Sequence, residues 1–485
     1  MRMKNSIFIA VVCLILAPSC YVLSQPAEDE VTSLPGLSTP PSFKQYSGYL
    51  DATGTKHLHY WYVESQNDPD NDPVVLWMNG GPGCSSLDGF LSELGPFHVN
   101  DDGNTLYVNP YSWNLVANVL FLEAPAGVGY SYADDKNYTT DDDQTAKDNY
   151  QALQSFFAKF PNRASNPFYI FGESYGGIYV PTLSMEVMNG NASINFQGFG
   201  VGNGVHDIPL EHNTAVPYAY YHGILGDDLW KDLQDNCCDG TSCNYYNNKN
   251  KQCQIAGSQV QHLIMDIGIN FYSIYMDCYG GIPPHLDRYL VDMKHLFSLP
   301  NSTATMKKTW LKKVKSSKQK PTFGMPLKDT IHPMHFDNNL GDTVPCINST
   351  AIHGYLNKPA VRQALHIKDG LPQWSICSDI NYKTIYADMY KQYNALLAKY
   401  RILIYHGDTD LACNFLGGQE FVNSLGQQEK AQRRAWIYKN QIAGFVHEFE
   451  NITYMTVKGA GHMVPQWKAP QALQMFTNFL NNKPQ

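Results

Sequence analysis

Short apolar runs alternate along much of this chain with longer stretches in which apolar residues recur at helical spacing. Three of the runs end in tight turns, and they cover residues 73–78, 117–123 and 168–171. Runs of this length, closed by glycine or proline, are typical of strands that are buried on both faces of a parallel sheet. Residues 140–160 carry three aspartates near their start and then continue at helical spacing, which predicts a crossover helix. The pattern therefore predicts an α/β fold.

The pattern changes in the middle of the chain. From residue 206 to residue 343 the strand rhythm fades and cysteines cluster, and the rhythm resumes at residues 400–405 and 452–457. We therefore expect an inserted module over residues 206–343, between two parts of one core, residues 25–205 and 344–485. Seven lysines crowd a short stretch of this module: Lys307, Lys308, Lys312, Lys313, Lys315, Lys318 and Lys320. We interpret the stretch as an exposed loop open to proteases, with a basic patch for an acidic partner as the alternative.

The N-terminus carries targeting information. Arg2 and Lys4 precede an apolar run over residues 7–17, and Val22 and Ser24 stand at the −3 and −1 positions of a cleavage point. This arrangement predicts a signal peptide over residues 1–24. The alternative, a membrane anchor, is disfavoured because the run is shorter than the roughly 20 residues that span a bilayer. We therefore expect a protein of the secretory pathway, lysosomal or secreted, with no membrane anchor.

Composition and charge narrow the function classes. The chain has 485 residues, of which 43% are hydrophobic and 16% are charged, and this profile excludes a largely disordered protein. Its formal net charge of −9 disfavours binding to nucleic acid. The chain is therefore expected to be a moderately acidic globular protein.

Cysteines and sequons agree with the secretory pathway. Removing the signal peptide takes away Cys13 and Cys20 and leaves nine cysteines, most of which should be paired in an oxidising compartment. Zinc is the competing interpretation of residues 237–243, but their spacing contains no C-x-x-C pair, so we expect no metal. Five N-x-[ST] sequons predict glycosylation at Asn137, Asn191, Asn301, Asn348 and Asn451.

One short motif points to a nucleophile. Residues 172–176 read G-x-S-x-G directly after a predicted strand, which is the context of a nucleophile elbow centred on Ser174. A serine hydroxyl needs a histidine base, and that base needs a carboxylate to orient it. Asp410 and His462 each follow a later predicted strand, in the chain order of α/β-hydrolases. Asp408 is the alternative carboxylate, and the alternative bases are His57, His59, His332, His335, His406 and His447.

Acyl transfer through a serine also needs an oxyanion hole, because the tetrahedral intermediate places a negative charge on the former carbonyl oxygen. The turn over residues 79–83 is rich in glycine and can approach a substrate closely. We expect the backbone N–H groups of Gly81 and Tyr175 to form the hole. An ordinary glycine turn is the alternative.

Four blocks of the sequence resemble the signature blocks of the serine carboxypeptidases, and the likeness runs from about residue 41 to the C-terminus. The blocks are Asn79-Gly80-Gly81-Pro82-Gly83-Cys84-Ser85-Ser86, Gly172-Glu173-Ser174-Tyr175-Gly176-Gly177, Gly407-Asp408-Thr409-Asp410 and Gly459-Ala460-Gly461-His462-Met463-Val464-Pro465. The resemblance implies an α/β-hydrolase fold with a central, mostly parallel sheet and an inserted, disulfide-rich cap. It also implies Ser174, Asp410 and His462 as the catalytic triad, and no metal or organic cofactor.

The resemblance further implies a site for the free carboxylate of a peptide, made by Asn79, Glu93, Glu173 and the amide of Gly80. A glutamate beside a carboxylate repels it unless one of them holds a proton. This requirement gives a physical reason for an acidic pH optimum. From the residues alone, Glu173 would be a charge at the start of a helix.

Several other features follow only from the resemblance. It implies the disulfides Cys84–Cys377, Cys278–Cys346, Cys237–Cys253 and Cys238–Cys243, with Cys413 as the free thiol. The lysine-rich stretch resembles an excision segment that is removed on activation of a zymogen. Further segments, at residues 371–374, 412–415 and 442–446, are similar to lysosomal members of the family. They imply a homodimer and lysosomal glycosidases as partners.

The sequence thus predicts a serine-type carboxypeptidase that removes the C-terminal residue of peptide substrates with a free C-terminus through an acyl-enzyme. Two alternatives remain open. One is a protective scaffold for other lysosomal hydrolases, and the other is an acyltransferase or esterase that uses the same triad.

Overall fold

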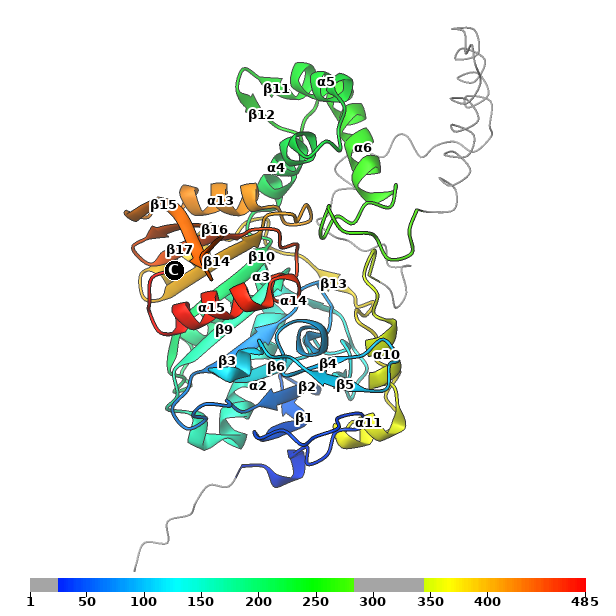
Figure 1. Cartoon of the computed structure of the whole chain (residues 1–485), viewed down its shortest axis with the longest axis vertical. Coiled ribbons are helices and arrows are strands. Elements are labelled where there is room, and N and C mark those ends of the chain that lie inside the picture. The colour runs from blue at the N-terminus through cyan, green and yellow to red at the C-terminus, as the bar shows by residue number, and fades with distance from the viewer. Residues whose placement is uncertain (1–24, 283–343) are drawn as a thin grey trace, which may run out of the picture.

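The computed structural model describes residues 25–282 and 344–485, and their centre is one large sheet (Figure 1). Its strand order is β1-β2-β6-β3-β9-β10-β14-β17-β16-β15, with β7 paired to β2. The six strands from β6 to β17 are parallel, and the strands at both edges are antiparallel. The predicted mostly parallel sheet is therefore confirmed. The strands are β1 (Gln45–Asp51), β2 (Lys56–Val63), β3 (Val74–Met78), β6 (Asn118–Leu122), β7 (Tyr132–Ala133), β9 (Phe168–Ser174), β10 (Phe196–Gly204), β14 (Arg401–Gly407), β15 (Glu429–Tyr438), β16 (Gln441–Phe449) and β17 (Ile452–Val457).

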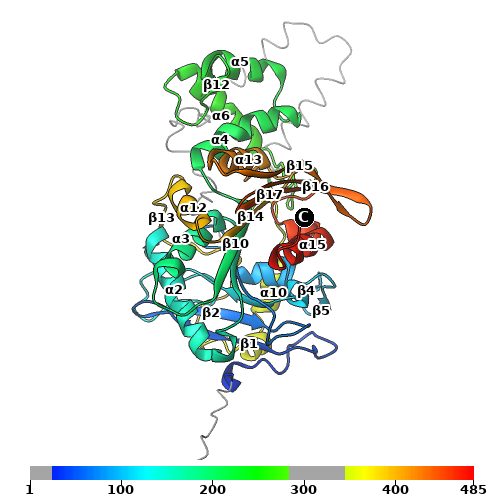
Figure 2. The same cartoon turned by 90° about the vertical axis from the view of Figure 1, so that its left-hand side faces the viewer.

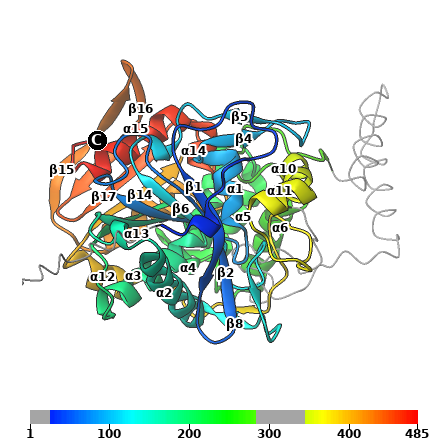
Figure 3. The same ribbon diagram turned by 90° about the horizontal axis from the view of Figure 1, so that it is seen from below.

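Helices cover both faces of this sheet (Figure 3). One face is covered by α2 (Asp142–Lys159), α3 (Gly176–Asn189), α12 (Tyr390–Leu397) and α13 (Phe415–Ser424). The other face is covered by α1 (Ser86–Asp88), a turn of π-helix (Gly89–Glu93), α10 (Thr350–Leu356), α11 (Pro359–Ala364), α14 (Val464–Trp467) and α15 (Ala469–Leu480). Small two-stranded pairs join β4 (Phe97–Val99) to β5 (Leu106–Val108), and β8 (Thr140–Asp141) to β13 (Tyr382–Lys383). The helix predicted over residues 140–160 is α2.

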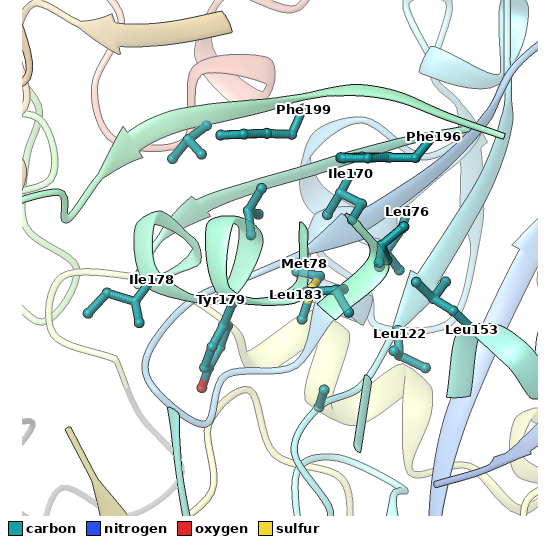
Figure 4. Close-up of a cluster of buried hydrophobic side chains, with 14 of the residues drawn as sticks. Leu76, Met78, Leu122, Leu153, Ile170, Ile178, Tyr179, Leu183, Phe196 and Phe199 are labelled. Carbon is teal, nitrogen blue, oxygen red and sulfur yellow. The ribbon is translucent and has the colours of Figure 1, made fainter. Parts of the chain in front are cut away.

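The central strands are buried on both faces, as their apolar runs predict. In β3, Leu76 and Met78 pack into the cluster beneath α3, and Val75 and Trp77 point to the opposite cluster. Side chains alternate across a strand, so a strand between two helix layers must be apolar at every position. Figure 4 shows the first cluster, where Leu183 of α3 packs with Leu76 and Met78.

A separate group of helices stands beyond one end of the sheet (Figures 1 and 2). It contains α4 (Ile208–Tyr221), α5 (Asp227–Cys237), α6 (Lys251–Met265) and the hairpin of β11 (Cys238–Asp239) and β12 (Ser242–Cys243). These elements share a third apolar cluster, which includes Leu233, Val260 and Phe271. They lie within the predicted inserted module, whose boundaries stay a prediction. The signal peptide and the seven lysines lie outside the described residues.

Four disulfides connect the described residues, and they join the same pairs that the family resemblance implied. Cys84–Cys377 and Cys278–Cys346 link segments that are 293 and 68 residues apart. Cys237–Cys253 and Cys238–Cys243 are local to the helical group. Cys413 is a free, buried thiol.

The predicted sequons differ in their surroundings. Asn137, Asn191 and Asn348 are exposed, whereas the Asn451 amide is partly buried and donates a hydrogen bond of 3.0 Å to the carbonyl of Leu397. Asn301 lies outside the described residues. Among the helices of the described residues, none combines the length and the apolar character that a bilayer crossing requires.

Candidate active site

Ser174 is the last residue of β9 and lies at a sharp turn into α3. Its φ of +60° is in the left-handed region, which residues with a side chain rarely adopt. A Cβ on Gly172 would lie 2.6 Å from the carbonyl oxygen of Met78, so the chain can pass here only with a glycine. The G-x-S-x-G motif therefore has the geometry of a nucleophile elbow.

Asp410 and His462 lie on the loops that follow β14 and β17, and both are buried. The Nδ1 atom of His462 is 2.8 Å from Oδ2 of Asp410. Asp410 accepts three further hydrogen bonds, from Asn203 Nδ2 at 2.8 Å, from the amide of Ala412 at 3.0 Å and from that of Cys413 at 3.1 Å. The contact between His462 Nδ1 and Asp410 orients the imidazole and leaves Nε2 as the nitrogen that can take up a proton.

The alternative carboxylate, Asp408, has different partners. Its Oδ1 accepts a hydrogen bond of 2.6 Å from the amide of Gly459, and its carbonyl accepts one of 2.9 Å from the hydroxyl of Tyr218. The structure therefore brings Asp410 to His462, while Asp408 braces the loop that leads to that histidine.

The alternative bases lie elsewhere. His57 pairs with Asp51 at 3.1 Å, and His447 pairs with Glu429 at 3.0 Å. His59 is buried against Glu123, and burial lowers the pKa of His406 well below its usual value. Of the alternative histidines that the structure describes, none lines the cavity that contains Ser174 and His462, and His332 and His335 lie outside the described residues.

Ser174 and His462 line one cavity, and several predicted site residues share it. Asn79, Gly80, Gly81 and Glu173 are on its wall. Its apolar wall comes from Val344, Ile347, Ile376 and Met463. Tyr175 and Glu93 are not on its wall, but Tyr175 follows Ser174 in the chain and Glu93 accepts a hydrogen bond from Asn79.

The glycine turn over residues 79–83 packs on the backbone beside Ser174. A Cβ on Gly80 would lie 2.4 Å from the amide nitrogen of Tyr175 and 2.7 Å from Cβ of Ser174. Gly81 has a φ of +112°, which also favours glycine. Within the part of the chain that the structure describes, the amides of Gly81 and Tyr175 donate no hydrogen bond to protein. Both are therefore available for a ligand.

Two glutamates share one amide group next to the serine. Asn79 Nδ2 donates to Oε1 of Glu93 at 3.0 Å and to Oε1 of Glu173 at 2.8 Å. Both carboxyl groups are buried, and the Oε2 atom of each has no hydrogen-bond partner within the described residues. Trp77 Nε1 holds the Asn79 oxygen at 2.8 Å and so fixes which side of the amide faces the glutamates.

Burial raises the pKa of both glutamates. The pKa of Glu93 rises from 4.5 to about 8, because of burial and the negative charge of Asp88. Burial and the negative charge of Glu93 raise the pKa of Glu173 well above its usual value. The pair therefore holds a proton at neutral pH and can offer it to an anionic ligand. Within the described residues, no group of three or more His, Cys, Asp or Glu side chains is arranged to hold a metal ion.

Comparison with known proteins assigns the family. The family model "Serine carboxypeptidase" matches residues 35–482. The chain belongs to the serine carboxypeptidases. The lysosomal protective protein of Mus musculus is 47% identical over 477 residues, which are 95% of each chain. Serine carboxypeptidase ctsa-4.1 of Caenorhabditis elegans is 40% identical over 481 residues, 96% of this chain and 95% of that protein.

A solved structure shows the same fold. The prohormone-processing carboxypeptidase Kex1 of Saccharomyces cerevisiae superposes with a TM-score of 0.67 at 20% identity, over 94% of this chain and 96% of the other. This superposition confirms the predicted α/β-hydrolase architecture. The family match and the relatives confirm the assignment as a peptidase.

Sequence reasoning missed two supports of the acid–histidine pair in this carboxypeptidase. Asn203, at the end of β10, bonds Asp410 and accepts the amide of Gly407 at 2.9 Å. The segment after α6 is the second support, because the carbonyl of Tyr272 accepts the His462 amide at 2.7 Å and that of Phe271 accepts the Leu411 amide at 2.9 Å. An asparagine between two glycines at a strand end was the available signal for Asn203, and nothing local marks residues 271–272.

Proposed function

We propose that Ser174, Asp410 and His462 form the catalytic triad of this serine carboxypeptidase. The Oγ atom of Ser174 attacks the carbonyl carbon of the last peptide bond, and His462 Nε2 takes its proton and passes it to the leaving amino acid. Water then hydrolyses the acyl-enzyme with the same histidine as base. The observation that carries the proposal is one cavity lined by Ser174, His462 and Glu173, with Asp410 bonded to the histidine behind it.

The amides of Gly81 and Tyr175 form the oxyanion hole in this proposal. They flank Ser174 and have no protein acceptor within the described residues. Fixed N–H donors stabilise the charge that develops on the carbonyl oxygen in the transition state.

The Glu93–Glu173 pair, with Asn79 and the Gly80 amide, recognises the free C-terminal carboxylate. The pair supplies a proton that lies between a glutamate and the substrate carboxylate, so that two anions need not face each other. Binding is therefore lost as the pH rises through the titration of the pair, and the pKa of Glu93 is about 8. The proposal places the pH optimum on the acidic side of that titration.

The decisive experiment compares two substrates and one variant. A blocked dipeptide with a free C-terminal carboxylate and the same dipeptide as its C-terminal amide are followed from pH 4.5 to pH 9, with Ser174→Ala as the control. We expect the free acid to be cleaved best at acidic pH and its cleavage to fall above about pH 8. We expect Ser174→Ala to lose on the order of 10⁴-fold or more in kcat.

Two outcomes would contradict the proposal in different ways. Full activity in Ser174→Ala would contradict the proposed catalytic triad. Equal cleavage of acid and amide at every pH would leave the triad intact but would remove the carboxylate site, and would favour an esterase or acyltransferase.

Location and partners extend the proposal. A relative named lysosomal protective protein supports delivery to the lysosome and a protective role. The proposal keeps the homodimer and the lysosomal glycosidase partners that the family resemblance implies. The exposed sequons Asn137, Asn191 and Asn348 support passage through the secretory pathway. Ser174→Ala separates the two roles, because a protective role survives loss of the nucleophile.

A further inference from the structure

Asp142, the first residue of α2, is fully buried and has an unusual number of partners. Its Oδ1 accepts hydrogen bonds from the hydroxyls of Tyr175 at 2.8 Å and Tyr382 at 2.7 Å. Its Oδ2 accepts the backbone amides of Ile385 at 2.6 Å and Tyr386 at 3.1 Å. An ionised carboxylate can accept about four hydrogen bonds, so this one is saturated.

Capping of the helix does not explain these contacts. The N-cap of α2 is Asp141, whose side chain accepts the amide of Gln144 at 2.8 Å. The side chain of Asp142 is directed instead to the segment over residues 382–386 and to the elbow. A buried carboxylate is costly unless donors surround it, so these donors define where it sits.

Tyr175 connects this carboxylate to the reaction. Its hydroxyl is bonded to Asp142, and to Thr384 at 2.8 Å, while its backbone amide directly follows Ser174. Burial and the charge of Asp142 raise the pKa of the Tyr175 phenol above its usual value, so the phenol stays a donor. Because the ring and the amide belong to one residue, fixing the ring limits the movement of the amide.

The segment just upstream of residues 382–386 also contacts the glycine turn that carries the other amide of the hole. Upstream of residues 382–386, Cys377 forms the disulfide with Cys84, and the Ser378 amide bonds the carbonyl of Gly83 at 2.9 Å. Residues 377–386 therefore contact the glycine turn at one end and Asp142 at the other.

We propose that Asp142 is a positioning residue for the oxyanion hole, which it serves by anchoring the Tyr175 side chain against the nucleophile elbow. The inference rests on the proposed role of the Tyr175 amide. Asp142 touches no reacting atom and acts through Tyr175.

The test is Asp142→Asn in the full chain, with Asp143→Asn as the matched control. Asn keeps the volume of the side chain but loses the charge and presents an NH₂ group to the donors. Asp143 is the next residue of α2 and accepts the Tyr386 hydroxyl at 2.6 Å, yet it does not contact Tyr175. The control therefore removes the same charge from the same turn of helix.

For Asp142→Asn we expect kcat on the free-acid dipeptide to fall by about 10- to 100-fold, with KM changed by less than about threefold. A peptide aldehyde forms a hemiacetal with Ser174 whose oxygen occupies the hole, so its affinity should fall by the same factor as kcat/KM. We expect Asp143→Asn to stay within about twofold of the wild type in all three measurements.

Tyr175→Phe is the second variant and keeps the inference testable if Asp142→Asn does not fold. It removes one hydroxyl, and we expect a loss in kcat similar to that of Asp142→Asn, with no further loss in the double variant. Wild-type kcat and aldehyde affinity in folded Asp142→Asn, or in Tyr175→Phe if the first variant is unstable, would overturn the inference. Full activity of Ser174→Ala would instead overturn the proposed function.

Discussion

Two buried acidic regions beside the cavity that contains Ser174 are built in opposite ways. Asp410 accepts four hydrogen bonds, from His462, Asn203 and two backbone amides. Glu93 and Glu173 share a single amide nitrogen, and each keeps one oxygen without a partner in the described residues. The first arrangement surrounds a carboxyl group with donors, whereas the second leaves two oxygens without donors and favours a retained proton. The supply of donors thus assigns different chemistry to the same functional group.

The largest expected effect is at Asp410. Asp410→Asn removes the charge that orients His462 and stabilises its cation, and we expect kcat to fall by about 10³- to 10⁴-fold. Asp408→Asn is the matched control from the same turn, because it bonds the Gly459 amide and not the histidine. The loss of kcat in Asp408→Asn should be at least about 100-fold smaller than in Asp410→Asn. Equal losses in steady-state kinetics would show that Asp410 has no special role.

The glutamate pair should set the pH dependence. Glu93→Gln replaces the group whose pKa is about 8 with a neutral side chain, so kcat/KM on a free acid should no longer fall near pH 8. In the wild type we expect that fall to approach tenfold per pH unit above the titration. The C-terminal amide substrate should show no such fall in either protein. An unchanged profile in the variant would assign the titration to another group.

Stability should follow the same contrast. The pKa of Glu93 rises on folding from 4.5 to about 8, so its protonation stabilises the fold fully below pH 4.5 and this contribution is lost as the pH rises through about 8. Glu93→Gln should therefore gain in Tm relative to the wild type by a few degrees at pH 8, and by less at pH 5.

Glu123 is the matched control for this stability prediction. It is also buried, but it accepts bonds from Trp374 Nε1 at 2.9 Å, from the Tyr130 amide at 3.0 Å and from His59 and Ser85. Glu123→Gln should lower Tm at both pH values, because it disrupts a satisfied carboxylate. If Glu93→Gln and Glu123→Gln shift Tm in the same direction, the number of hydrogen-bond donors does not distinguish these two buried glutamates.

The smallest effect concerns Cys413. Burial and the negative charges of Glu211 and Asp410 raise the pKa of its thiol well above its usual value. The native protein should therefore react with a thiol reagent only on denaturation, at one thiol per chain. Rapid reaction of the native protein would show that the Asp410 region is open to solvent.

The sequence predicts the centre of this fold better than its edges. β3, β6 and β9 are apolar at nearly every position because helices cover both faces, so composition alone marks them. The antiparallel strand β15 is largely exposed, β16 mixes buried and exposed positions, and their pairing is interrupted by register shifts, so no regular pattern marks them. Five of the six parallel strands therefore could be predicted from the chain. The glycine-rich β10 and the outer hairpin could not.

Residues of the candidate site also differ in whether the sequence predicts them. Ser174 and His462 stand in glycine-rich turns after strands, which leaves a local signal. Asp142 looks from the sequence like one of three aspartates at a helix start, and its partners are 33 to 244 residues away. Positioning contacts of this kind depend on the finished fold and leave no local pattern.

The two long-range disulfides determine what a proteolytic cut would do to the enzyme. Cys278–Cys346 brackets the lysine-rich stretch, and Cys84–Cys377 closes a still larger loop around it. A protease that cuts between residues 283 and 343 would thus produce two polypeptides, one with Ser174 and the other with Asp410 and His462, that remain a single molecule. The two would separate on an electrophoresis gel only after reduction, so the catalytic centre would be shared between two chains that began as one.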